Sequence, residues 1–305
     1  MIYSHDIIKK RILVTGATGL LGGHVLHYFK DRKNIQLLAC SIEDSASLDG
    51  IDYVKCDITN RDEVKKVAYD FYPDFIINAA AYTNVNLSEV EREKAWKLNV
   101  HAVEYLAEVC RVLDAQLIHI SSDYIFDGKN GPYSEIDKPN PVSYYGRTKL
   151  ASENALKISG AIHTILRANV LYGTTGTGKK DFVTWLVENL MKNQQVRIVI
   201  DQVNNPTYAE DLVELMGKII LYQKHGIYNV GGLKFLSRYD FALMIADVFK
   251  LDPSLITPIK TEELNQPALR PLKSGLVTLK AEAELGYRPH ELIETLFIIK
   301  RQLSL

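Results

Sequence analysis

Cysteine is scarce in this 305-residue chain, and the few cysteines are widely separated. Cys40, Cys56 and Cys110 are odd in number, so they indicate neither a disulfide framework nor a Cys-x-x-Cys metal motif. The eight histidines are scattered and form no ligand pattern with a cysteine. We therefore predict no metal site, and we expect the cysteines to pack in cores of a protein from a reducing compartment.

A surplus of charge and a long apolar run are also missing. Thirty-six basic residues face 37 acidic ones, and the isoelectric point is near 6.7. This balance excludes an electrostatic drive toward nucleic acid or anionic membrane. No stretch reaches the roughly 18 apolar residues of a membrane span, and the opening MIYSHDIIKK lacks the apolar run of a signal peptide. We expect a cytoplasmic protein without nucleic-acid or membrane partners. The sequence does not decide its oligomeric state, and a homodimer is possible.

The first 170 residues alternate short β-branched runs with longer segments of helical period. Strands are predicted at 11–15, 35–40, 53–56, 75–79, 117–121 and 164–167, with helices between them. The longest predicted helix covers 91–113, where apolar residues recur at steps of three and four. The fold class is therefore α/β, a doubly wound parallel Rossmann sheet, to which a smaller, mostly helical C-terminal substrate lobe is added.

The pattern loosens after Tyr172-Gly173 and suggests how the two parts divide. A Gly/Thr/Lys loop, TTGTGKK, precedes a helix from about Asp181 and a strand at 196–200. From Gly231 onward, helices are separated by prolines and no further βαβ regularity is visible. We predict a dinucleotide-binding domain at 9–173, with 196–230 returning to it, and a substrate-binding lobe at 174–195 and 231–305.

A glycine-rich turn, GATGLLG from Gly16, directly follows the first strand and runs into a helix. Gly16 permits the tight turn, Gly19 lets backbone N–H groups approach a pyrophosphate, and Gly22 lets the helix pack close to the strand. The pyrophosphate then lies at the positive end of the helix dipole. The residues predicted to hold the cofactor here are Gly16, Thr18, Gly19, Leu20, Leu21 and Gly22.

The end of the second strand predicts which cofactor is accepted. Ser41 stands where an acidic residue would bind the adenosine ribose. A carboxylate there repels a 2′-phosphate whereas a hydroxyl can donate to it, so NADPH becomes acceptable and NADH stays open. Asp57, followed by Ile58, is a candidate contact to the adenine, although an Asp at a strand end is as often a cap or turn former.

Tyr145 and Lys149 are four residues apart in a segment of helical pattern, so both share one helix face. Ser122 ends a buried strand, at the sheet edge where ligands bind. Hydride transfer to a ketone needs a positioned acid, and a neighbouring ammonium is expected to lower the pKa of the tyrosine. Each residue alone would be unremarkable, but together they favour a catalytic set of Ser122, Tyr145 and Lys149.

These residues belong to a wider set of motifs that resembles the extended short-chain dehydrogenase/reductases and, within them, the dTDP-4-dehydrorhamnose reductase family. The motifs are TGATGLLG from Thr15, NAAAYTNV from Asn78, SSDYIFDG from Ser121, PVSYYGRTK from Pro141, DQVNNPT from Asp201 and RPLKSGL from Arg270. They span nearly the whole chain. The last two are much more specific than a glycine-rich turn.

The resemblance implies a reaction and further site residues. The reaction is NAD(P)H-dependent reduction of the 4-keto group of a nucleotide-linked deoxysugar, with dTDP-4-dehydrorhamnose giving dTDP-rhamnose as the leading case. Tyr145 and Lys149 would also contact the cofactor, whose cleft would be lined by Ala79, Ala80 and Ala81. The residues implied to bind the substrate are Asp123, Tyr124 and Val170 at the sugar and Arg270 at the diphosphate.

Three positions depart from that family's pattern. Val170 stands in the segment where the family usually has a tryptophan, which removes an aromatic wall over the sugar. Asn86 stands where an acidic residue is usual, and Ser122 where threonine is commoner. The serine keeps the hydroxyl, whereas the other two changes leave the identity of the sugar open.

Two alternatives share the fold. A nucleotide-sugar 4,6-dehydratase normally has an Asp-Glu pair after the strand-end hydroxyl, but this chain has Asp123-Tyr124 and so lacks the second carboxyl. A non-catalytic, NADP-binding regulatory subunit resembling the methionine adenosyltransferase β subunit would also suit the Val-Leu-Tyr-Gly stretch. The complete set of Ser122, Tyr145 and Lys149 favours the enzyme over the subunit.

Overall fold

The computed structural model describes residues 9–44, 50–174 and 181–305. Its centre is a seven-stranded sheet in which all neighbouring strands are parallel. Across the sheet the strands are β11 (Gly226–Val230), β6 (His163–Ala168), β5 (Gln116–Ser122), β4 (Phe75–Asn78), β1 (Lys10–Thr15), β2 (Ile35–Ser41) and β3 (Asp52–Lys55). The strand order reverses between β1 and β4, which makes this a doubly wound Rossmann sheet and confirms the predicted fold class.

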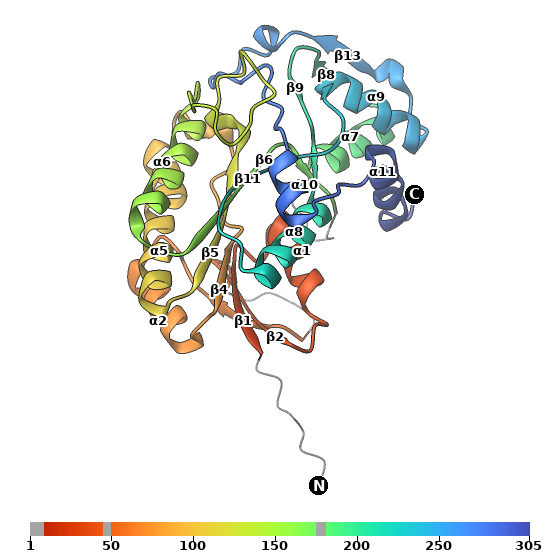
Figure 1. Ribbon diagram of the computed structural model, residues 1–305. Helices are drawn as coiled ribbons and strands as arrows, with labels where there is room; N and C mark the ends of the chain where they lie inside the picture. Colours follow the sequence, from red (N-terminus) through yellow and green to blue (C-terminus); the bar gives the residue numbers. More distant parts are fainter. Residues whose placement is uncertain (1–8, 45–49, 175–180) are drawn as a thin grey trace.

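Helices cover both faces of the sheet because its strands are apolar on both sides. In β1, Ile12 and Val14 face one core and Leu13 faces the other. On the Ile12 side pack α1 (Leu20–Phe29) and α8 (Ala209–Tyr222), whereas α2 (Arg61–Phe71), α5 (Ala102–Leu113) and α6 (Tyr144–Ser159) pack on the other (Figure 1). The carboxyl ends of the strands stay uncovered by these helices and are left for ligands.

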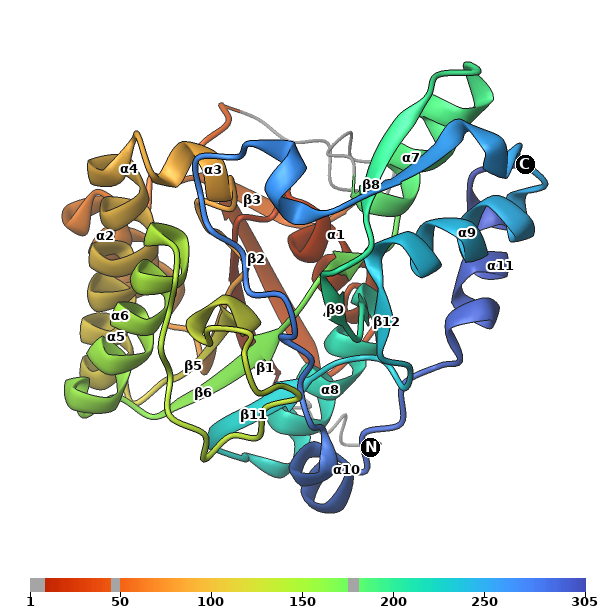
Figure 2. The same ribbon diagram turned by 90° about the horizontal axis from the view of Figure 1, so that it is seen from above.

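A third core lies in the lobe. It is shared by α7 (Phe182–Met191), α9 (Arg238–Phe249) and α11 (Leu292–Gln302), and β8 (Val196–Val199) forms a parallel pair there with β13 (Ile256–Ile259). Figure 2 shows these helices together on the side of the molecule away from α5 and α6. The lobe therefore has an apolar core of its own.

The segment 196–230, predicted to return to the sheet, divides between the two parts. β8 pairs with β13 in the lobe, whereas α8 and β11 complete the sheet domain. Conversely, α10 (Leu279–Leu285), from the stretch predicted for the lobe, packs on the sheet domain: Lys280 Nζ donates to the Ile227 carbonyl over 2.9 Å. The chain thus crosses between the two parts several times.

The helical run predicted at 91–113 is interrupted by one wider turn. It consists of α4 (Arg92–Trp96), a π-helical turn (Lys97–His101) and α5. π-turns are rare and concentrate at functional sites. Periodicity does not reveal this turn, because the apolar positions continue on either side of it.

The remaining elements are short. They are α3 (Val85–Ser88), the 3₁₀ turns Asp123–Ile125, Pro253–Leu255 and Thr261–Leu264, the pair β7 (Leu171–Tyr172) with β10 (Thr207–Tyr208), and the pair β9 (Val203–Asn204) with β12 (Leu236–Ser237). Within the described residues, no helix combines the length and apolarity needed to cross a bilayer.

Candidate active site

The turn between β1 and α1 lies against the end of β4. Gly16 has a φ of 66°, and a Cβ there would lie 2.7 Å from the Cα of Ala80. A Cβ on Gly22 would lie 2.2 Å from the Gly16 carbonyl oxygen, so only glycine allows α1 to pack this close. Gly19 caps α1, and no side chain of the described residues accepts from the first helical N–H groups. These N–H groups are therefore available to an anion.

A cavity of about 330 Å³ opens beside this turn, at the carboxyl ends of β4, β5 and β6. Its lining includes the predicted residues Gly19, Leu20, Leu21, Ala79, Ala80, Ala81, Ser122, Tyr145, Lys149 and Val170. The closely packed glycine turn, the available N–H groups and the adjoining cavity fit a nicotinamide dinucleotide. The predicted residues outside this lining are Gly16, Thr18, Gly22, Ser41, Asp57, Ile58, Asp123, Tyr124 and Arg270.

Helix α6 brings Tyr145 and Lys149 to the cavity. The Ser143 side chain caps this helix by accepting from the Gly146 N–H over 3.1 Å, which fixes the start of the helix just before Tyr145. Lys149 follows one turn later, and its Nζ donates to the Ile120 carbonyl at 2.5 Å. Ser122 stands at the end of β5. The three predicted catalytic residues therefore meet at one wall of the cavity.

Burial dominates the electrostatics of this set. It raises the pKa of Tyr145, the Asp123 carboxylate raises it further, and a hydrogen bond with Ser122 opposes both. The pKa of Tyr145 is thus raised and not lowered as expected, because desolvation of the phenolate is the largest effect. Burial lowers the pKa of Lys149 to about 8, and the Glu153 carboxylate opposes that shift. At neutral pH the phenol is therefore protonated and the lysine mostly charged, as a proton donor and its supporting cation require.

Asp123 is placed differently from its prediction. It was expected to face the sugar, but it is only 1% exposed and lies outside the cavity lining. Its Oδ1 accepts from Ser122 Oγ at 3.0 Å and its Oδ2 from Ser274 Oγ at 2.5 Å. Burial raises its pKa to about 6. Asp123 therefore orients Ser122 and ties the RPLKSGL segment to the end of β5.

Arg270 lies by a second, larger cavity of about 750 Å³ between the loop after β8 and residues 260–272. Its Nε donates to Gln266 Oε1 at 2.5 Å and its NH2 to Asn86 Oδ1 at 3.1 Å, while its buried NH1 has no partner among the described residues. Asn86 is one of the departures from the family pattern. Because it is neutral, the charge of Arg270 is left available to an anionic ligand.

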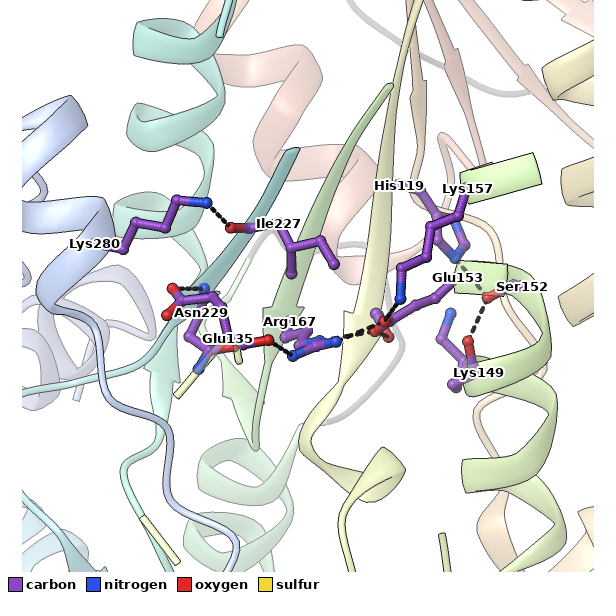
Figure 3. Close-up of polar contacts among 11 residues, drawn as sticks. His119, Glu135, Lys149, Ser152, Glu153, Lys157, Arg167, Ile227, Asn229 and Lys280 are labelled. Atoms are coloured by element: carbon purple, nitrogen blue, oxygen red, sulfur yellow. Dashed lines mark hydrogen bonds and ion pairs between the residues drawn. The ribbon is translucent and has the colours of Figure 1, made fainter. Parts of the chain in front are cut away.

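A buried ionic network behind α6 was not predicted (Figure 3). Arg167 on β6 donates from Nε and NH2 to the two Glu153 oxygens at 2.9 and 2.8 Å, and Ser121 Oγ donates to Glu153 Oε1 at 2.6 Å. Both partners of the ion pair are almost completely buried. Since Glu153 lies one turn after Lys149, the pair fixes α6 against β5 and β6.

Asn99, in the π-helical turn, was also missed. Its Oδ1 accepts from the Tyr82 N–H at 2.8 Å, and its Nδ2 donates to Thr148 Oγ1 at 2.9 Å. Thr148 directly precedes Lys149 on α6. The amide of Asn99 thus joins α6 to the loop after β4, and the signal for it in the sequence is a polar residue between two apolar ones.

A carboxylate that no sequence motif indicates lies near Ser41. Ser41 Oγ lies 2.9 Å from Thr18 Oγ1, and Thr18 Oγ1 donates to Glu43 Oε2 at 3.1 Å. Hydrogen bonding from Ser41 lowers the pKa of Glu43, which keeps this carboxylate charged. A carboxylate two residues past the strand end opposes a 2′-phosphate and so moderates the preference for NADPH inferred from Ser41.

We expect Glu43→Gln to lower the KM for NADPH about two- to fivefold while the KM for NADH stays unchanged or rises, because only NADPH has a phosphate to be repelled. The exposed position of Glu43 keeps the effect small. Steady-state kinetics with both cofactors measure it, and Asp44→Gln, at the exposed neighbouring residue, is the matched control. An equal response of the two cofactors would remove Glu43 from cofactor selection.

Asp57 acts as a turn former in this structure. Its Oδ1 accepts from the Thr59 N–H at 2.9 Å and from Thr59 Oγ1 at 2.8 Å. Ile58 is 3% exposed, and its side chain packs in the core beneath α2 and α5. Only the backbone of Ile58 is therefore left for the predicted contact with adenine.

The comparisons with known proteins agree on one family. The RmlD substrate binding domain model matches residues 10–300. The dTDP-4-dehydrorhamnose reductase of Aggregatibacter actinomycetemcomitans is 35% identical over 92% of this chain and 95% of its own length. A crystal structure of dTDP-4-dehydrorhamnose reductase from Bacillus anthracis in complex with NADP superposes with a TM-score of 0.84 at 27% identity, covering 96% of this chain and 99% of that one.

The methionine adenosyltransferase 2 β subunit of Danio rerio is similar as well, at 32% identity over 90% of this chain and 84% of its own length. Proteins named as a reductase and as a subunit of an adenosyltransferase are therefore both similar to this chain. The family model matches almost the whole chain, and both relatives are similar to it over most of its length. The chain therefore belongs to the family of the RmlD substrate binding domain.

Proposed function

We propose that this chain reduces the 4-keto group of a nucleotide-linked deoxysugar, with dTDP-4-dehydrorhamnose as the leading substrate and NADPH as the cofactor, NADH being accepted too. The observation that carries the proposal is the meeting of Ser122, Tyr145 and Lys149 at a cavity beside the glycine-rich turn. Relatives named as this reductase, one of them solved with NADP, support it. The three buried, free cysteines suit a cytoplasmic site of action.

The residues divide the reaction among them. The nicotinamide cofactor, when bound, supplies a hydride to the carbonyl carbon. Tyr145 donates its phenolic proton to the carbonyl oxygen, and Ser122, oriented by Asp123, holds that oxygen in line. The ammonium of Lys149 stabilises the phenolate that remains. Asn99 and the Arg167–Glu153 pair keep α6 in the position that this transfer needs.

The proposal is tested with a panel of keto-sugar nucleotides, following the loss of NADPH absorbance. We expect turnover with dTDP-4-dehydrorhamnose and with related dTDP-linked 4-keto-6-deoxyhexoses. Selectivity among sugars should be low, because Val170 replaces the aromatic wall that the family usually has. A panel without any turnover would contradict the proposal.

The second candidate function is the regulatory subunit, favoured by the likeness to the methionine adenosyltransferase β subunit. In this function the chain would use the cofactor site but not Ser122, Tyr145 and Lys149 as catalysts. Co-purification with a methionine adenosyltransferase, together with NADP binding and no turnover, would decide for it. Turnover of a keto-sugar nucleotide decides for the enzyme.

Arg270→Ala is expected to raise the KM for every active nucleotide sugar about tenfold or more. A charge-assisted hydrogen bond to phosphate contributes about 1.5 to 3 kcal/mol, and about 1.4 kcal/mol is already a factor of ten. The kcat should change less, since Arg270 lies outside the catalytic cavity. Steady-state kinetics across the panel measure both constants, and Arg288→Ala, at an exposed arginine, is the control. An unchanged KM would place the diphosphate elsewhere.

A further inference from the structure

Arg238 lies close to Arg270 in space although 32 residues separate them in the sequence. It is the first residue of α9, directly after β12, and β12 pairs with β9 through Ser237 and Val203. On the other side of β9, the Val203 N–H donates to the Leu272 carbonyl over 2.6 Å. The two arginines are therefore carried by segments that flank the same short strand, β9 (Figure 2).

The guanidinium of Arg238 is partly buried and lies over the ring of Phe182, 4.7 Å from its centroid. Phe182 follows Asp181, which lines the catalytic cavity. Among the described residues, no acceptor or carboxylate forms a hydrogen bond or ion pair with this guanidinium. A desolvated cation held against an aromatic ring without an anionic partner is a site at which a ligand anion gains most.

Charged groups act on Arg238 from a distance, but none among the described residues bonds to its guanidinium. Burial lowers its pKa, the charges of Tyr124 and Asp123 raise it, and the charge of Arg270 lowers it. The Asp123 oxygens accept from Ser122 and Ser274, and Gln266 and Asn86, side-chain partners of Arg270 among the described residues, are neutral. Arg238 and Arg270 are therefore two cations close enough for the charge of one to act on the other, and neither forms an ion pair within the described part of the chain.

We propose that Arg238 and Arg270 bind the substrate's diphosphate together, with one guanidinium for each phosphate, and that Arg238 holds the phosphate nearer to the sugar. This inference rests on the proposed function and adds a binding residue to it. Two cations on either side of β9 match two adjacent phosphates, because each phosphate brings a negative charge and several acceptor oxygens. The sugar then extends from Arg238 past Phe182 and Asp181 toward Tyr145.

The test measures binding rather than turnover, so that it does not depend on the reaction. Calorimetric titration of the NADPH-bound protein with dTDP and with thymidine compares the unmodified chain with Arg238→Met. We expect the Kd for dTDP to rise at least tenfold and the Kd for thymidine to stay unchanged. Arg238→Lys should recover part of the loss, and Arg301→Met, at an exposed arginine of α11, should have no effect.

NADPH affinity and the thermal midpoint of each variant show whether the fold is intact. If Arg238→Met folds and binds dTDP as the unmodified chain does, while Arg270→Met is weakened, the inference is wrong. The proposed function can be contradicted independently of this inference. A chain that turns over no keto-sugar, but whose dTDP affinity depends on Arg238, would contradict the reductase and leave the two-arginine site standing.

Discussion

Tyr145→Phe is expected to lower kcat about 100- to 10,000-fold, the usual loss for a general acid. Its hydroxyl, which lines the cavity, is the proposed proton donor, and burial raises the pKa of this group, so it is protonated at neutral pH. The substitution removes one hydroxyl and keeps the ring, which packs edge-on against Tyr124 at 5.5 Å. The affinity for NADPH should therefore change little.

Tyr144→Phe is the matched control, because it removes a hydroxyl one position earlier on the same helix, where the ring lies under the Arg92 guanidinium. Rapid-mixing measurements of a single turnover separate the chemical step from product release. If Tyr145→Phe keeps most of kcat, the proton comes from another group and the assignment of Tyr145 is lost.

Arg167→Met is expected to lower the free energy of unfolding by about 3 to 5 kcal/mol, because it leaves the Glu153 carboxylate buried without its charged partner. The double variant Arg167→Met with Glu153→Leu should recover much of this loss, since a buried ion pair can often be replaced by apolar groups of similar volume. Denaturant unfolding of the single and double variants measures both quantities.

The matched control is Lys157→Met, which removes the partly exposed third member of the network, 3.6 Å from Glu153. It should cost less than about 1 kcal/mol. A small loss for Arg167→Met, similar to that of the control, would mean that water or another group solvates Glu153. The pair would then not be what fixes α6 against the sheet.

The sequence was most informative where local chemistry is repeated along the chain. Apolar strands and helical periods predicted the parallel sheet, and the glycine spacing predicted a turn in which Gly16 and Gly22 leave no room for a Cβ. Tyr145 and Lys149 are four residues apart, and helix geometry therefore predicted that they share one face of a helix. These features depend on neighbours within a few residues, which a single sequence displays directly.

Pairing between segments that are distant in the sequence could not be predicted in this way. Nothing local distinguishes β8, which pairs with β13 in the lobe, from β11, which joins the sheet. Glu43, Asn99 and Arg238 were missed because each acquires its role from a partner distant in sequence or from the absence of one. Asp123 was misplaced for the same reason, since Ser274 holds it from 151 residues away.

Isotope transfer shows whether a hydride moves from the cofactor to the 4-keto carbon. The protein is incubated with dTDP-4-dehydrorhamnose and NADPH that carries deuterium at the transferable position of the nicotinamide, and the product is analysed by mass spectrometry and NMR. We expect dTDP-rhamnose with one deuterium on C4 of the sugar, formed far more slowly by Tyr145→Phe. No reduced sugar, or a reduced sugar without deuterium at C4, would contradict this expectation.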